Sequence, residues 1–255
     1  MYYLKEGSLE TENPVFQRLE EGGLLFPERR TAYDFARYKS YEHALVHWAI
    51  DMIEPGKVFL DIGAHVGTWS LAFAKKCAKV HSFEPTPRTF NFLCGNIALN
   101  NLDDRIVAHN LALADKEGRL PIHVGSPDGG GNSLLQMVDR KPSWMVEVKT
   151  LDSMGLTNVG LIKIDVEGFE KNVIQGGLET LKASGYPRIF FESWVPEREA
   201  EGIPSKSLRS ELFAYIESIG YTVVPIRGYS EMFIAEYTTS TPSVQAEQTS
   251  QSIRR

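Results

Sequence analysis

Short apolar runs along the chain alternate with segments whose apolar residues have helical spacing. The runs at 58–62, 79–83 and 160–164 have the length and composition of parallel strands that are buried on both faces. Helical segments are expected at 40–53, 69–73, 88–100 and 169–182. Strands that alternate with helices predict a doubly wound, mostly parallel α/β sheet.

The remaining segments extend this sheet. Strands are expected at 105–110, 119–124, 145–150 and 188–191, and the last long helix at 205–218. Residues 221–226 and 232–237 predict a closing hairpin, which makes the terminal strand antiparallel. These elements indicate one α/β domain at 39–237, preceded by an N-terminal cap segment at 1–38. Residues 238–255 are rich in Ser, Thr and Gln and are expected to be disordered.

The segment from Val58 to Pro85 predicts a nucleoside-binding crevice. Gly63 and Gly67 let the chain turn sharply after the first strand and approach a ligand closely. Glu84 ends the next strand, where a carboxylate can accept hydrogen bonds from both ribose hydroxyls. Ligands of open α/β sheets bind outside the carboxyl ends of the strands, which is where both features lie.

The spacing of the glycines distinguishes two classes of cofactor. Dinucleotide-binding loops have the pattern G-x-G-x-x-G, whereas this loop is G-x-x-x-G with Asp61 just before it. A carboxylate at that place disfavours a pyrophosphate and suits an ammonium group, such as the amino-acid end of S-adenosylmethionine. The pattern therefore favours a methyl donor. An NAD-type oxidoreductase and a non-catalytic donor-binding module remain alternatives.

Composition and charge limit the classes of molecule that the protein is expected to bind. The net charge is −6 and there is no basic patch of the size that phosphate-backbone binding needs, so nucleic acid is not expected as a partner. No apolar run reaches the roughly 18 residues of a membrane span, and the N-terminus lacks the layout of a signal peptide. With only two cysteines, the chain is expected to be a cytoplasmic protein without a membrane partner.

Four segments resemble the FkbM-type methyltransferases: DIGAHVG at 61–67, FEPTPRTFNFLCGNIALN at 83–100, TLDSM at 150–154 and KIDVEGFE at 163–170. The resemblance covers roughly residues 57–194. It implies a seven-stranded class I (Rossmann-like) methyltransferase sheet and an S-adenosylmethionine-dependent O-methyltransferase, many of which act on sugars or on hydroxyls of natural products. One departure is His65, because the family more often has asparagine there.

The resemblance also implies roles in donor binding. Residues around the methionine part of the donor would be Asp61, Gly63, Ala64, His65 and Gly67. Glu84 and Pro85 would hold the ribose, and Ala112 would line the adenine pocket through its backbone. Asp165 would lie beside the donor as well, because it ends the fourth core strand.

Asp165 is the first candidate for the general base that removes the acceptor's hydroxyl proton. Glu167 follows at the two-residue period and can point to the same side, and close carboxylates raise one another's pKa. His65 is a further catalytic candidate. Asp165 and Glu167 could instead bind Mg²⁺ or Mn²⁺, which would acidify the hydroxyl directly. Glu170 fits either this cluster or the first turn of a helix, where a negative charge is favourable.

The acceptor is expected to be a small molecule, a sugar or a glycan precursor. Asn132 and Ser133 end a glycine-rich loop at 125–133 that could close over it. Glu167 lies at the same mouth. Glu192 and Trp194 follow the fifth core strand, where an acid and an aromatic ring could hold a sugar.

Overall fold

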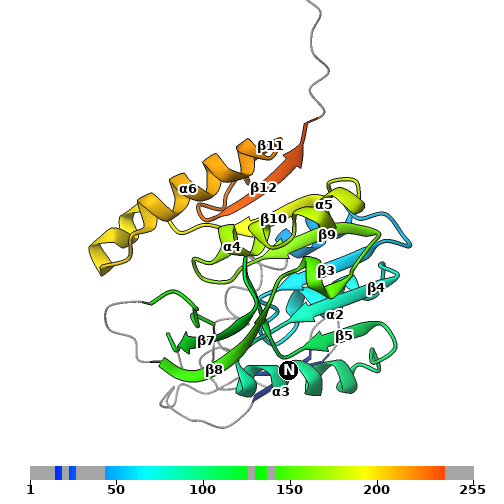
Figure 1. Ribbon diagram of the computed structural model, residues 1–255. Coiled ribbons are helices and arrows are strands. Elements are labelled where there is room, and N and C mark those ends of the chain that lie inside the picture. Colours follow the sequence, from blue (N-terminus) through cyan, green and yellow to red (C-terminus); the bar gives the residue numbers. More distant parts are fainter. Residues whose placement is uncertain (1–14, 19–22, 27–43, 126–129, 137–141, 239–255) are drawn as a thin grey trace, which may run out of the picture.

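The computed structural model describes residues 15–18, 23–26, 44–125, 130–136 and 142–238. Its centre is a seven-stranded sheet in the order β11-β12-β10-β9-β3-β4-β5 (Figure 1). The strands are β3 (Val58–Ile62), β4 (Lys79–Phe83), β5 (Ile106–His109), β9 (Val159–Ile164), β10 (Arg188–Glu192), β11 (Tyr221–Pro225) and β12 (Met232–Tyr237). Pairing from β10 through β5 is parallel, and β12 is antiparallel to both of its neighbours.

The predicted fold class is therefore confirmed. The antiparallel terminal strand β12 is inserted between β10 and β11, so β11 rather than β12 forms the edge of the sheet. On β3 the side chains alternate between two cores. Phe59 packs in the core that contains Trp69 and Phe73, whereas Leu60 and Ile62 face the opposite core.

Helices cover both faces of the sheet, as expected for a doubly wound fold. Residues 44–50, α2 (Thr68–Phe73) and α3 (Pro87–Leu99) contribute to the first core. The other face is covered by α4 (Glu170–Gln175), α5 (Leu178–Ala183) and α6 (Ser205–Ser218). In Figure 1, α6 flanks β11 and β12, and α3 lies at the opposite edge near β5.

A second, smaller sheet interrupts the alternation between β5 and β9. It has the order β6-β8-β7 and consists of β6 (Ala112–Leu113), β7 (Gly118–His123) and β8 (Pro142–Lys149). The strands predicted at 119–124 and 145–150 are thus confirmed, but they lie outside the main sheet (Figure 1). Within the predicted N-terminal cap, β1 (Val15–Arg18) and β2 (Gly23–Phe26) form an antiparallel hairpin whose second strand lies near α3.

One predicted helix is wrong in extent. The segment 169–182 was expected to be continuous, but α4 ends at Gln175 and α5 begins at Leu178. At Gly176 a Cβ would lie 2.1 Å from the carbonyl oxygen of Ala114, and at Gly177 it would lie 2.8 Å from Leu151. The two glycines therefore let the chain pass close to β6, and the helix breaks there.

Two short 3-10 helices, η1 (Asp152–Met154) and η2 (Pro196–Glu201), complete the described elements. In the described part of the chain, no helix is both long enough and apolar enough for a membrane span. Some predictions fall outside the described residues, namely those for the tail from residue 239, for residues 126–129 of the glycine-rich loop, for residues 40–43 of the first predicted helix and for most of the cap segment at 1–38.

Candidate active site

The loop between β3 and α2 is fixed to the end of β4. The backbone N–H groups of Gly63 and Ala64 donate to the carbonyl oxygen of Phe83 at 3.0 and 2.9 Å. Gly63 and Gly67 have positive φ values of 81° and 97°, which glycine adopts without strain. His65, between them, has a positive φ of 50°. The loop therefore turns tightly beside the tip of β4, where Glu84 follows.

Gly63 also brings this loop against the end of β9. A Cβ at Gly63 would lie 1.8 Å from the backbone oxygen of Asp165, so no other residue fits without moving the chain. The N–H of Asp165 donates to the carbonyl of Ile62 at 3.0 Å. The predicted donor loop and the predicted base are thus in direct backbone contact.

Glu84 is buried at the tip of β4 and held by backbone donors. Its Oε2 accepts from the N–H of His65 at 3.1 Å, and its Oε1 accepts from the N–H of Thr86 at 2.8 Å. Burial raises the pKa of Glu84 to about 7, against these hydrogen bonds, which lower it. A carboxylate has about four lone-pair sites, so Glu84 can still accept from a ribose hydroxyl beside these contacts.

The rest of the predicted donor crevice adjoins Glu84. The amide of Asn110 donates to the carbonyl oxygens of Glu84 and Pro85 at 2.9 and 3.2 Å. Asn110 lies two residues before Ala112, which is buried at the start of β6. The ends of β4 and β5 are therefore tied together where the adenine and ribose contacts are expected.

Asp61 is buried on β3 beside Ser70 and Lys163. Its carboxylate is 1% exposed and accepts from Ser70 Oγ at 2.5 Å. The ammonium group next to it belongs to the protein, because Lys163 Nζ lies 3.7 Å from Asp61 Oδ1. Burial raises the pKa of Asp61, and Lys163 opposes that effect. Among the described residues its Oδ1 atom has no hydrogen-bond partner, and contact of this carboxylate with the donor stays a prediction.

Lys163 is a residue whose role the sequence analysis missed. It is 4% exposed, donates to the carbonyl oxygen of Gly63 at 2.7 Å and lies 3.3 Å from Asp165 Oδ2. One buried ammonium group therefore connects Asp61, the glycine loop and Asp165. A single lysine in the otherwise apolar strand VGLIKI was the available signal.

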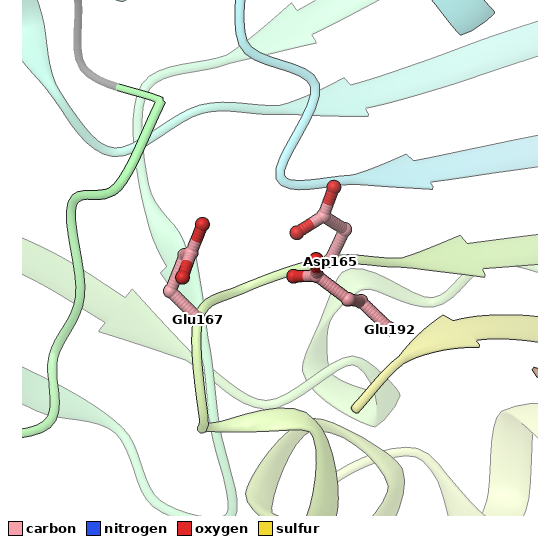
Figure 2. Close-up of side chains that lie close together, drawn as sticks. All are labelled: Asp165, Glu167 and Glu192. Atoms are coloured by element: carbon pink, nitrogen blue, oxygen red, sulfur yellow. The ribbon is translucent and has the colours of Figure 1, made fainter. Parts of the chain in front are cut away.

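Three carboxylates meet at the ends of β9 and β10. Asp165, Glu167 and Glu192 each place an oxygen within 4.8 Å of the others, and Figure 2 shows the side chains converging. Their proximity follows from the sheet, because β9 and β10 are parallel neighbours and end at the same edge. The sequence analysis grouped Asp165 and Glu167 as possible metal ligands; the structure adds Glu192 as a third oxygen donor.

Two carboxyl groups of this cluster, those of Glu167 and Glu192, have raised pKa values. Burial is the main cause for both Glu167 and Glu192, and the nearby charge of Asp165 adds to it. The pKa of Glu167 rises to about 8, and that of Glu192 lies well above its ordinary value. These raised pKa values favour the protonated form of Glu167 and Glu192, while Asp165 forms its ion pair with Lys163.

Glu170 stands apart from the cluster. Its Oε1 accepts from the N–H groups of Val166 and Gly168, both at 3.1 Å, in the first turn of α4. This is the helix-terminal alternative that the sequence left open. Burial raises the pKa of Glu170 to about 7.

The predicted acceptor residues on the 125–133 loop have protein partners. Asn132 Nδ2 donates to Thr86 Oγ1 at 3.1 Å, and Ser133 Oγ donates to the carbonyl oxygen of Glu167 at 2.6 Å. The end of this loop therefore bridges the Glu84 side and the acidic cluster. Binding of the acceptor by Asn132 and Ser133 stays a prediction.

Trp194 is likewise not presented as an open platform for a sugar. It is 4% exposed, and the Arg198 guanidinium lies 4.7 Å from its ring centre. Its Nε1 donates to Glu167 Oε2 at 3.0 Å. Trp194 therefore orients Glu167, which also has a positive φ of 57°.

The raised pKa of Glu167 predicts a pH-dependent stability difference. Between its ordinary pKa of 4.5 and about 8, the folded protein holds a proton that the unfolded chain releases. The stability of the wild type therefore falls as the pH rises through this range. Glu167→Gln cannot ionise, so it does not lose stability in this way. From pH 5 to pH 8 its melting temperature should therefore rise relative to that of the wild type, by about 2–4 °C for each kcal/mol of unfolding free energy that the wild type loses.

This difference is measured by thermal melts of both proteins in EDTA. The matched control is Glu217→Gln, which alters an exposed residue of α6 and should leave the difference from the wild type constant with pH. A constant difference for Glu167→Gln would contradict the assigned protonation.

Fold and site together define a class of protein. A seven-stranded, mostly parallel sheet with an inserted antiparallel strand, a glycine loop after β3 and an acid at the tip of β4 are features of the class I, S-adenosylmethionine-dependent methyltransferase fold. Residues 61–223 match the family described as "Methyltransferase FkbM domain". The chain belongs to this family, which places it with methyltransferases rather than with NAD-type oxidoreductases.

Individual relatives agree with this assignment. The chain is 32% identical to the 2-O-methyltransferase NoeI of Sinorhizobium fredii over 170 residues, which cover 58% of this chain and 68% of the relative. It is 26% identical to the 31-O-demethyl-FK506 methyltransferase FkbM of Streptomyces tacrolimicus, over 68% and 75% of the two chains. The crystal structure of the methyltransferase FkbM from Methylobacillus flagellatus KT matches with a TM-score of 0.51 at 17% identity. That match covers 71% of this chain and 44% of the other, so it supports the fold alone.

Proposed function

We propose that this protein transfers a methyl group from S-adenosylmethionine to a hydroxyl group of a small acceptor, a sugar or glycan precursor. The observation that carries the proposal is Asp165: its backbone touches the glycine loop at Gly63, and its carboxylate belongs to the acidic cluster. A proton acceptor thus lies directly beside the expected donor site. The names of the two relatives, a 2-O- and a 31-O-methyltransferase, support a hydroxyl oxygen as the acceptor atom.

The donor-binding residues fit the donor's parts. Glu84 offers a fixed carboxylate to the ribose, and the loop from Gly63 to Gly67 turns beside it. Ala64 and His65 lie within this loop, and Pro85 and Ala112 flank the Glu84 side. Asp61 would act indirectly, through Lys163 and the carbonyl oxygen of Gly63.

The donor and the protein would contribute different parts of the methyl transfer. S-adenosylmethionine supplies a methyl carbon on a positively charged sulfur, which departs as a neutral thioether when the acceptor oxygen bonds to that carbon. The protein must hold the hydroxyl in line with this carbon and accept its proton. Positioning can contribute about 7–11 kcal/mol, and a general base about 10²–10⁴-fold in rate. Asp165 is the proposed base, and Glu167 and Glu192 would hold the hydroxyl through hydrogen bonds.

The proposal also includes a divalent cation bound at the acidic cluster. Asp165, Glu167 and Glu192 supply three oxygen donors of the kind that Mg²⁺ and Mn²⁺ prefer. A cation at this place would acidify the acceptor hydroxyl and release the protons held by Glu167 and Glu192.

A turnover screen tests both parts. The purified protein is incubated with S-adenosylmethionine and a panel of nucleotide sugars and oligosaccharides, with and without EDTA, and release of S-adenosylhomocysteine is measured. We expect turnover with at least one hydroxylated acceptor, loss of turnover in EDTA and recovery with Mg²⁺ or Mn²⁺. Turnover that EDTA leaves unchanged would remove the cation from the mechanism. Donor binding without turnover on any acceptor would favour the non-catalytic alternative.

A further inference from the structure

A cavity of about 250 Å³ lies between α4 and α6, and Glu192 forms part of its wall. Because Glu192 also belongs to the acidic cluster, the cavity adjoins the place where the proton is removed. The first turns of α4 and α6 begin at the same edge of the sheet as the ends of β9 and β10. The cavity is therefore a continuation of the proposed active site and lies outside the donor-binding loop.

The walls of this cavity are held by specific contacts. Arg209 of α6 donates to the backbone oxygen of Ser193 and lies 5.0 Å from the ring centre of Phe233, which fixes the chain after β10. Lys171 of α4 and Glu211 of α6 form an ion pair at 2.8 Å between the two helices. The cavity is thus formed by packed elements before any ligand binds.

The lining suits a small hydroxylated ring. The amide side chain of Gln175 and the carboxyl group of Glu192 can bind hydroxyl groups, and Leu208 supplies apolar surface. Cavities for drug-sized ligands measure about 300–1,000 Å³, so 250 Å³ suits a single ring rather than an extended chain.

The charges of the lining discriminate among such rings. Three acidic residues, Glu170, Glu192 and Glu211, and one basic residue, Lys171, are among the described residues that line the cavity. Lys171 is already paired with Glu211, so a carboxylate or phosphate on the ligand would lose its hydration without gaining a free cationic partner in the lining. A neutral or amino-substituted ring is favoured over an anionic one.

We infer that the cavity between α4 and α6 binds a neutral or amino-substituted sugar ring of the acceptor and rejects anionic rings. This inference rests on the proposed methyl transfer, since it assigns a subsite of the same reaction. It locates acceptor recognition on the far side of Glu192 from the donor-binding loop.

The test compares three probes of equal size: the methyl glycosides of a hexose, a 2-amino-hexose and a hexuronic acid. Binding of each is followed by saturation-transfer NMR in the presence of S-adenosylhomocysteine. We expect signals from the first two glycosides and at least tenfold weaker binding of the hexuronic acid. If none of the three binds, or if the hexuronic acid binds best, the inference is overturned.

Variants that block the cavity test whether the hexose glycoside binds there. Leu208→Trp should weaken binding of the hexose at least tenfold, because Leu208 lines the cavity. The matched control is Ser207→Trp, on an exposed position of the same helix, which should bind as the wild type does. If Leu208→Trp melts early, Gln175→Trp blocks the cavity from the facing helix. Unchanged hexose binding in the folded blocked variant would overturn the assignment.

Calorimetric titration with S-adenosylmethionine distinguishes a failure of the proposed function from a failure of the acceptor subsite. Donor binding that survives in Leu208→Trp shows that the lost sugar binding is specific to the cavity. If the wild type binds no donor, the proposed function fails. If it binds the donor but none of the glycosides, only the acceptor subsite fails.

Discussion

Asp165→Asn is expected to lower turnover by about 10²–10⁴-fold, the usual contribution of a general base. The amide has nearly the same shape as the carboxylate but does not take up the hydroxyl proton at neutral pH. Donor binding should persist, because the contact with Gly63 is made by the backbone of residue 165 and Glu84 is unchanged. Turnover is measured by S-adenosylhomocysteine release, and donor binding by calorimetry.

Two further variants make this prediction specific. Asp51→Asn alters an exposed carboxylate that pairs with Lys76 at 3.5 Å, and it should leave turnover unchanged. Glu192→Gln removes a neighbouring carboxyl group of the cluster and should lower turnover less than Asp165→Asn does. If Asp165→Asn retained wild-type turnover, or if Glu192→Gln had the larger effect, Asp165 would not be the base.

Much of the fold could be predicted because its signals are local. The helix at 205–218 was predicted with the bounds that it has, and the hairpin strands at 221–226 and 232–237 nearly so. Local signals failed at 169–182, because the break at Gly176 depends on Ala114, which is distant in sequence. The insertion of β12 between β10 and β11 likewise depends on pairing between strands, which periodicity does not encode.

The residues of the candidate site likewise fall into those with a local signal in the sequence and those whose contacts join distant segments. Glu84 and Asp165 were identifiable because each ends a core strand, and strand ends share one edge of the sheet. The partners of Ser133 and Trp194 were not identifiable, because their hydrogen bonds to Glu167 join segments far apart in the chain. The contact between Asp61 and the donor's ammonium group stays a prediction, whereas its ion pair with Lys163 was not identifiable from the sequence.

Lys163→Met is expected to have the largest effect on stability. It removes the buried ammonium group and leaves Asp61, which is 1% exposed, with an uncompensated carboxylate. Breaking a buried ion pair in this way costs about 3–5 kcal/mol. At about 2–4 °C for each kcal/mol in a chain of this size, thermal melts should show a clear fall in melting temperature.

The double variant Asp61→Asn with Lys163→Met separates charge burial from positioning. It leaves no uncompensated charge at Asp61, so its melting temperature should lie above that of Lys163→Met alone. Turnover should stay low, because the carbonyl oxygen of Gly63 loses its donor and Asp165 loses its ion pair. A double variant no more stable than Lys163→Met would show that Asp61 and Lys163 are not energetically coupled. One that recovered full turnover would show that Lys163 serves stability alone, and that the glycine loop and Asp165 keep their places without it.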